Sequence, residues 1–338
     1  MRLHCGVLSL GFDMQRRNFI TLLGSAATFW PLAAGAQQTL PTIGLLTTTK
    51  LDDWAIGAIR KGLDEVGYVE GRNLTIIYRS ADGQFDRLAA LAADLASSQV
   101  SVILATGSPV PARVAKAATT TIPIVFAYGG DPVADGLVAS FNRPGGNVTG
   151  ATFIATALTA KRLELLREIA PRAADVAILV NPKGTLAEIQ TRDAKEAAQV
   201  LGQHLHIVNA SSENEIDEAF KTMGQLKVEA LLVSTDPFYG FLRSEQLVGL
   251  ASRYKIPAMY DSRKYADAGG LMSYGANLPG TWQQAGVYVG RILKGEKPSD
   301  LPIVQPTKFE MVINLKVVKA LGLEIPPKLL ATADEVIE

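Results

Sequence analysis

Short runs of β-branched and other apolar residues alternate with amphipathic helical patterns along most of this 338-residue chain. Thr42–Leu46 is expected to be a buried strand, followed by a helix that begins near Asp53 and ends before Gly67. Further strands are expected at residues 74–78, 100–105, 122–127, 176–180, 205–208, 230–234 and 256–259. Further helices are expected near residues 85–95, 185–201, 213–226, 239–252, 280–293 and 314–321. Because one open sheet rarely exceeds about ten strands, this alternation predicts an α/β protein with two doubly wound parallel-sheet lobes.

Three segments are expected to connect the lobes and to form a hinge. The richest turn cluster of the chain, 142–150, is interpreted as the first connection, although an ordinary surface loop would have the same composition. A Gly-rich stretch at 268–275 and an extended segment at 302–313 are interpreted as the second and third connections. The resulting division gives lobe 1 residues 41–150 and about 276–306, and lobe 2 residues 151–275 and about 307–338.

Residues 1–36 have the features of an export signal. Arg16-Arg17 precede an uncharged stretch from Phe19 to Leu32, and Ala34-Gly35-Ala36 supplies the small residues that a signal peptidase accepts. The paired arginines resemble the twin-arginine consensus, so we favour that export route over the ordinary secretory route and over an uncleaved N-terminal anchor. Cleavage after Ala36 would place the mature protein in the periplasm, and Met14 is an alternative start of the chain.

Composition excludes several classes of protein. Lys plus Arg and Asp plus Glu both number 33, so the chain lacks the basic character of a protein that binds nucleic acid or a membrane surface. The only cysteine, Cys5, would be removed with the signal, which leaves no disulfide and no cysteine-based metal site. His204 and His206 alternate on one expected strand and are interpreted as surface or edge residues rather than metal ligands. We therefore expect a soluble monomer that needs no metal or cofactor and is not inserted in the membrane after cleavage.

Several motifs extend over most of the chain after the signal. Their sequences are DPV at 131–133, GLVAS at 136–140, RPGGNVTG at 143–150, GGLMSYG at 269–275, QPTKFE at 305–310, INLK at 313–316 and ADEVIE at 333–338. Together with the signal, they resemble the type I ABC transporter substrate-binding family that includes tryptophan-type binding proteins. The resemblance implies a Venus-flytrap fold, no catalytic residues, and delivery of a small molecule to an ABC permease and its ATPase.

Loops that follow the expected strands should form the ligand site, because ligands of open parallel sheets bind beyond the carboxyl ends of the strands. The candidate ligand-binding residues are Thr47, Thr48, Thr106, Gly107, Ser108, Tyr128, Asp131, Asn181, Ser234, Asp236, Tyr260 and Asn277. Within this set, Thr106-Gly107-Ser108-Pro109 is typical of a helix N-terminus that holds an anion, here a ligand carboxylate. In the alternative interpretation, Ser108 only caps its helix, and both roles are compatible.

An amino-acid ligand would also need an acceptor for its ammonium group. Asp236 and Asp131 lie in suitable loops, although each is followed by proline and could instead be a turn residue. Tyr128 and Tyr260 could line the pocket for an aromatic or aliphatic side chain, or could fill the core. The sequence therefore indicates an amino acid, or an aromatic or aliphatic acid, as the ligand, and closure of the lobes around it as the mode of binding.

Other functions receive less support from the sequence. Leu271–Gly275 lacks the first glycine of a nucleophile elbow, and no glycine-rich dinucleotide motif follows the first strand, so an α/β enzyme is disfavoured. A transcription regulator with the same two lobes would need a helix-turn-helix where this chain has its export signal. A periplasmic sensor that reports its ligand to a receptor would use the same pocket and remains an alternative.

Overall fold

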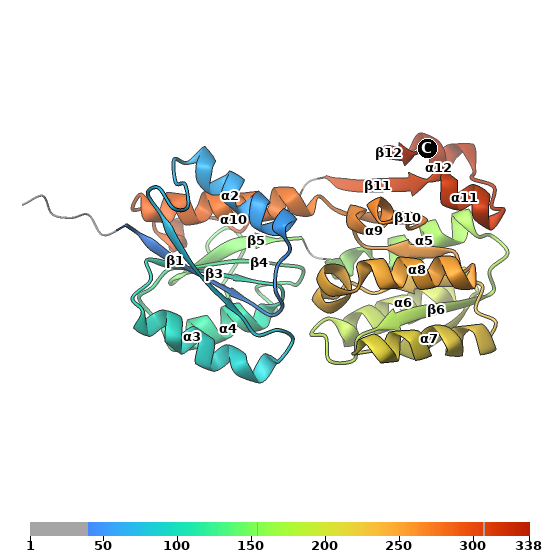
Figure 1. The fold of residues 1–338 in the computed structure, drawn as a ribbon, viewed down its shortest axis with the longest axis horizontal. Helices are drawn as coiled ribbons and strands as arrows, with labels where there is room; N and C mark the ends of the chain where they lie inside the picture. Colours follow the sequence, from blue (N-terminus) through green and yellow to red (C-terminus); the bar gives the residue numbers. More distant parts are fainter. Residues whose placement is uncertain (1–39, 154, 307) are drawn as a thin grey trace, which may run out of the picture. The chain divides into compact units, whose positions relative to one another are not determined.

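The computed structural model describes residues 40–338, except for residues 154 and 307 and the side chain of Thr156. The expected export signal lies outside the described residues. Within them the strands form two separate sheets (Figure 1). No helix of this described part is long and apolar enough to cross a membrane.

The first sheet has five parallel strands in the order β2-β1-β3-β4-β5. Their bounds are β1 Thr42–Thr47, β2 Thr75–Ser80, β3 Val102–Thr106, β4 Ile124–Tyr128 and β5 Val148–Thr152. Its helices are α2 Asp53–Glu65, η1 Phe85–Arg87, α3 Leu88–Ser97, α4 Pro109–Ala118, α10 Leu278–Leu293 and η4 Pro298–Asp300. Asp52 caps α2, because its side chain accepts a hydrogen bond from the Ala55 amide over 3.0 Å.

Apolar residues on both faces of the first sheet explain its two helical layers. Leu45 packs in a cluster with α2 and α10, whereas the next residue, Leu46, packs in a second cluster with α3 and α4. This difference follows from the alternation of side chains along a strand. Figure 1 shows α2 and α10 on one side of the sheet and α3 and α4 on the other.

The second sheet has seven strands in the order β12-β11-β10-β9-β8-β6-β7. Their bounds are β6 Asp175–Val180, β7 His204–Asn209, β8 Ala230–Val233, β9 Ala258–Tyr260, β10 Met272–Ala276, β11 Phe309–Asn314 and β12 Glu335–Ile337. Its helices are η2 Ala155–Leu158, α5 Thr159–Ile169, α6 Ala187–Leu201, α7 Glu213–Gln225, α8 Ser244–Tyr254, α9 Arg263–Asp267, α11 Leu315–Leu321 and α12 Pro327–Ala331. A π-helical turn, η3 (Phe238–Leu242), precedes α8.

The prediction of two doubly wound α/β lobes is confirmed, with one correction at the edge of the second sheet. Strands β6 to β10 are parallel, but β11 pairs antiparallel to β10 and β12 pairs parallel to β11. The expectation of a wholly parallel sheet was therefore wrong there. The reason is that β11 enters this sheet directly from an extended connection, without the crossover helix that a parallel neighbour requires. His204 and His206 lie on the edge strand β7, where His206 Nε2 is 2.8 Å from the Asp175 carboxylate.

Among the described residues, the chain passes between the two sheets at three places. The turn cluster at 142–150 leads into β5, which pairs with β4, so the chain leaves the first sheet only after Thr152. It leaves the second sheet after β10, at Asn277, where the Asn277 side chain accepts a hydrogen bond from the Gly280 amide and caps α10. Val304 forms a bridge with Ala151 beside β5, so the last connection lies between Val304 and β11. The turn cluster is therefore part of the first lobe.

Helices α2 and α10 approach each other closely at a glycine. A Cβ atom on Gly62 of α2 would lie 1.9 Å from the Gln283 carbonyl oxygen of α10, whereas one on Gly57 of the same helix would meet no atom within 4 Å. We therefore expect Gly62→Ala to lower the free energy of unfolding by at least ~1–3 kcal/mol, as overpacking does. The matched control Gly57→Ala should raise it by ~1 kcal/mol through helix propensity. Urea unfolding of both variants measures the difference, and equal effects would contradict this packing.

Candidate functional site

A cavity of about 480 Å³ lies at the carboxyl ends of the strands of both sheets. The first sheet contributes segments that follow β1, β3, β4 and β5, and the second contributes segments that follow β6, β8, β9 and β10. The main lining residues are Asp52, Trp54, Gly107, Tyr128, Phe153, Leu186, Thr235, Asp236, Phe241, Asp261, Arg263, Lys264, Asp267, Asn277, Trp282 and Glu310. This is the position in which open α/β sheets bind ligands.

Buried hydrogen-bond donors without partners lie beside Gly107, on the first-lobe side of the cavity. Gly107 lines the cavity with a φ of +96°, and a Cβ on it would lie 2.2 Å from Thr48 Oγ1. The hydroxyls of Thr48, Thr49 and Thr106 are buried and have no hydrogen-bond partner among the described residues. Ser108 caps α4 by accepting a hydrogen bond from the Val110 amide over 3.3 Å. The predicted cap is thus confirmed. Because Pro109 and Pro111 have no N–H and the Val110 amide is bonded to Ser108, an anion here would depend on the threonine hydroxyls and the positive end of the helix.

Aromatic residues form much of the remaining wall. Trp54, Phe153, Phe241 and Trp282 all line the cavity, and the rings of Phe241 and Trp282 are 6.2 Å apart in an edge-on contact. Tyr128 also lines it, with its hydroxyl donating a hydrogen bond to Asp135 over 2.7 Å. These surfaces can pack against a flat or apolar ligand body.

Asp236 is the most buried carboxylate in the lining, only 9% exposed. It follows β8, and its Oδ1 accepts hydrogen bonds from Asn181 Nδ2 over 3.0 Å and from the Phe238 amide over 2.9 Å. Burial raises the pKa of Asp236 to about 6, although these hydrogen bonds oppose the shift. The site therefore contains a carboxylate that would gain from a cationic partner.

A second carboxylate, Asp261, follows β9 in the same lining. Burial raises its pKa, while the charge of Arg162 lowers it. Arg162 is buried on α5 and donates hydrogen bonds to the carbonyl oxygens of Tyr274 and Ala155 over 2.7 and 3.3 Å, and to Thr235 Oγ1 over 3.1 Å. Burial lowers the pKa of Arg162, and the negative charge of Asp261 opposes this shift.

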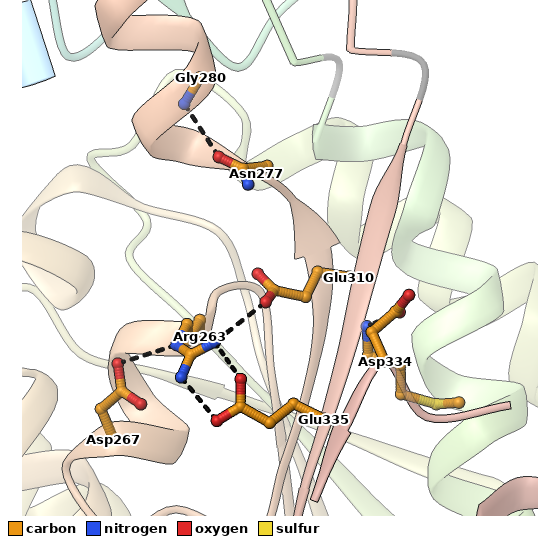
Figure 2. Close-up of polar contacts among 8 residues, drawn as sticks. Arg263, Asp267, Asn277, Gly280, Glu310, Asp334 and Glu335 are labelled. Atoms are coloured by element: carbon orange, nitrogen blue, oxygen red, sulfur yellow. Dashed lines mark hydrogen bonds and ion pairs between the residues drawn. The ribbon is translucent and has the colours of Figure 1, made fainter. Parts of the chain in front are cut away.

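The two cations of the lining are neighbours on α9 and are both paired. Figure 2 shows Arg263 held between the carboxylates of Asp267, Glu310 and Glu335. Its Nη2 lies 2.7 Å from Glu335 Oε1, which links α9 to the C-terminal strand β12. Lys264 Nζ lies 2.7 Å from Asp52 Oδ2 and 5.8 Å from the centre of the Phe241 ring.

The structure places the sequence-predicted residues in three groups. Gly107, Tyr128, Asp236 and Asn277 line the cavity. A second group is buried beside these residues without lining the cavity: Thr47, Thr48, Thr106 and Ser108 near Gly107, and Asn181 behind Asp236. The third group lies outside the lining.

In this third group, Asp131 is exposed and accepts hydrogen bonds from the Val133 and Ala134 amides, which is its alternative role as a turn residue. Ser234 is buried at the end of β8. Tyr260 fills the core and stacks on Tyr265 with ring centres 4.6 Å apart. Neither Asp131 nor Tyr260 is therefore retained as a ligand contact.

Comparison with known proteins gives a consistent family. The ABC transporter substrate binding protein family matches residues 49–337. A tyrosine-binding protein of Clostridioides difficile strain R20291 is 27% identical over 265 residues, which cover 78% of this chain and 75% of that protein. The crystal structure of an ABC domain from Streptococcus pneumonia in complex with L-Trp is 25% identical, with a TM-score of 0.77 and coverage of 88% of this chain and 99% of that one.

A third relative was solved without ligand. The ligand-free, open structure of a substrate binding protein with adhesive properties from Clostridium difficile is 27% identical, with the same coverage of both chains and a TM-score of 0.61. The match of the family over nearly all of the described residues confirms the resemblance seen in the sequence. This chain belongs to the ABC transporter substrate-binding protein family.

Proposed function

We propose that this protein binds an amino acid outside the cytoplasmic membrane and delivers it to an ABC importer made of a permease and an ATPase. The observation that carries the proposal is a cavity with hydrogen-bond donors beside it in one lobe and a buried carboxylate in the other. Unpartnered hydroxyls and the N-terminus of α4 adjoin it in the first lobe, and the buried carboxylate of Asp236 lies in the second. An α-carboxylate and an α-ammonium group match these two features.

The relatives support the same class of ligand. One is described as a tyrosine-binding protein and another was crystallised with L-Trp. Here Trp54, Phe153 and Trp282 would pack against the ligand side chain. The relatives are binding proteins rather than enzymes, and we assign no catalytic residue to this site.

We propose that the ligand binds between the lobes and stabilises their closed arrangement. The structure is more similar to the L-Trp complex than to the ligand-free, open relative, with TM-scores of 0.77 and 0.61. The Asp52–Lys264 ion pair joins a residue of the first lobe to one of the second across the cavity lining. A ligand that contacts both lobes would favour this arrangement by its higher affinity for it, and the permease would recognise the closed form.

Thermal unfolding against the twenty amino acids tests the proposal. A ligand present at 100 times its dissociation constant should add about 2.7 kcal/mol to the free energy of unfolding. A shift with one or a few amino acids is the expected result. A flat panel, repeated after denaturation and refolding to remove any carried-over ligand, would contradict amino-acid binding.

Gly107→Ala should greatly weaken this binding, because a methyl group there would meet Thr48 Oγ1 and strain a backbone at φ +96°. Gly136→Ala is the matched control, since Gly136 also has positive φ, +72°, but a Cβ there would meet no atom within 4 Å. Both variants should lose some stability through backbone strain. Only Gly107→Ala should lose the amino-acid-induced thermal shift; loss of the shift in both would remove Gly107 from the site.

A further inference from the structure

The charges that line the cavity are unequal. Among the described lining residues, the side chains of Asp52, Asp236, Asp261, Asp267 and Glu310 are acidic, and those of Arg263 and Lys264 are basic. Which of these charges is free to meet a ligand depends on the ion pairs already formed in the protein.

Both basic residues are already neutralised by protein carboxylates. Arg263 contacts Asp267, Glu310 and Glu335, and Figure 2 shows all three acidic side chains directed at its guanidinium group. Lys264 is paired with Asp52, whose other oxygen caps α2. A ligand carboxylate would therefore meet no unpaired cation among the described lining residues.

Two carboxylates remain without a direct ion pair, Asp236 and Asp261. The charge of Arg162, which lies on α5 outside the lining, acts on Asp261. Arg162 donates hydrogen bonds to neutral oxygens, those of Tyr274, Ala155 and Thr235. Arg162 thus compensates Asp261, whereas Asp236 has no ion pair among the described residues, and the site is left with excess negative charge.

A ligand anion is offered only neutral donors in the first lobe. These are the buried hydroxyls of Thr48, Thr49 and Thr106. The start of α4 adds no free amide, because Pro109 and Pro111 have no N–H and the Val110 amide is bonded to Ser108. A hydrogen bond from one of these hydroxyls to a ligand carboxylate has one charged partner. A contact between a ligand ammonium group and Asp236 has two opposite charges, so a Coulomb attraction is added to the hydrogen bond.

From this imbalance we infer that a ligand must carry a positive charge to bind at this site. A carboxylate on the ligand strengthens binding but is not required. The ligand class is then primary amines with an apolar or aromatic body, amino acids among them, and carboxylic acids that lack an amine are excluded. The inference rests on the proposed function for the location of the site, and it narrows the ligands that the sequence left open.

The first arm of the test uses the amino acid that binds best in the panel, its decarboxylated amine and its deaminated acid, by titration calorimetry at pH 7.5. The amine should bind within about 10-fold of the amino acid, and the acid at least 10-fold more weakly than the amine. An acid that binds as tightly as the amine would overturn the inference while leaving amino-acid binding intact.

The second arm needs no knowledge of the ligand body. Ethylammonium chloride, sodium acetate and sodium chloride are compared at equal ionic strength by thermal unfolding of the full chain and of Asp236→Asn. Ethylammonium should stabilise the unmodified protein beyond sodium chloride, and this gain should be absent in Asp236→Asn. The control Asp175→Asn, at the opposite end of the second sheet in β6, should keep the gain.

The two arms separate the failure of the inference from that of the proposed function. An ethylammonium effect that depends on Asp236, combined with a flat amino-acid panel, would support an amine site and contradict amino-acid binding. An acetate effect without an ethylammonium effect, or an ethylammonium effect that Asp236→Asn retains, would overturn the inference, as would no effect of either ion. Asp261→Asn replaces Asp236→Asn in this arm if the latter does not fold.

Discussion

Replacement of Asp236 with asparagine is expected to stabilise the ligand-free protein at pH 7.5 and to abolish ligand binding. Asparagine keeps a side-chain oxygen for the hydrogen bonds donated by Asn181 and the Phe238 amide. It removes the cost of a buried charge, which is expressed in the rise of the Asp236 pKa from 3.8 to about 6. A shift of this size corresponds to as much as ~3 kcal/mol in the free energy of unfolding.

The sign of this effect depends on pH. Because the folded pKa lies above the unfolded one, the folded state binds the proton more tightly between about pH 4 and pH 6, and stability falls as pH rises through that window. The gain from Asp236→Asn should therefore be small near pH 4 and full above pH 6. Urea unfolding of both proteins at pH 4, 5, 6 and 7.5 measures it. A variant that is less stable at pH 7.5, or that still binds the amino acid, would show that the carboxylate serves structure rather than ligand.

The pattern of buried strands explains why the fold was readable from the sequence. Strands such as β3 and β4 are buried along their whole length and mostly apolar, because helices cover both faces of the sheet. The C-terminal edge of the second sheet could not be predicted from the sequence in the same way. The direction of β11 depends on where the preceding extended segment enters the sheet, and no local pattern specifies that direction.

The candidate site was predictable in part for a similar reason. Asp236 was found because it lies in a loop directly after a strand, where side chains reach a ligand. Tyr260 and Asp261 are adjacent at such a position, and successive side chains at a strand end point in opposite directions, so the tyrosine fills the core and the aspartate lines the cavity. Sequence position alone did not decide between them.

Arg162 had no sequence signal at all. It lies within helix α5, and its partners are contributed by segments about 70 and 110 residues away, at Thr235 and Tyr274. An arginine in an amphipathic helix is ordinarily solvent-exposed, and only the tertiary fold buries this one, at 2% exposure. The same holds for Lys264, whose partner Asp52 is recognisable from sequence only as a helix cap.

Arg162→Met is expected to lower the free energy of unfolding by ~3–5 kcal/mol, because it removes three buried hydrogen bonds of a charged donor and a charge that compensates Asp261. The change leaves the carbonyl oxygens of Ala155 and Tyr274 without their donor and Asp261 without a compensating charge. These oxygens lie next to two of the segments that connect the sheets, so the loss should extend to ligand binding. Arg172→Met, at an exposed position after α5, is the control and should change stability by less than ~0.5 kcal/mol.

The electrostatic part of this effect can be separated from the loss of packing. If the uncompensated charge of Asp261 accounts for much of the cost, adding Asp261→Asn to Arg162→Met should restore part of the lost stability, giving a coupling energy of at least ~1 kcal/mol in a double-mutant cycle. Strictly additive effects would mean that Arg162 acts only through its hydrogen bonds to Tyr274, Ala155 and Thr235. Coupling in the cycle would instead show that the buried guanidinium permits a second carboxylate in the cavity, and hence the excess negative charge that selects an amine.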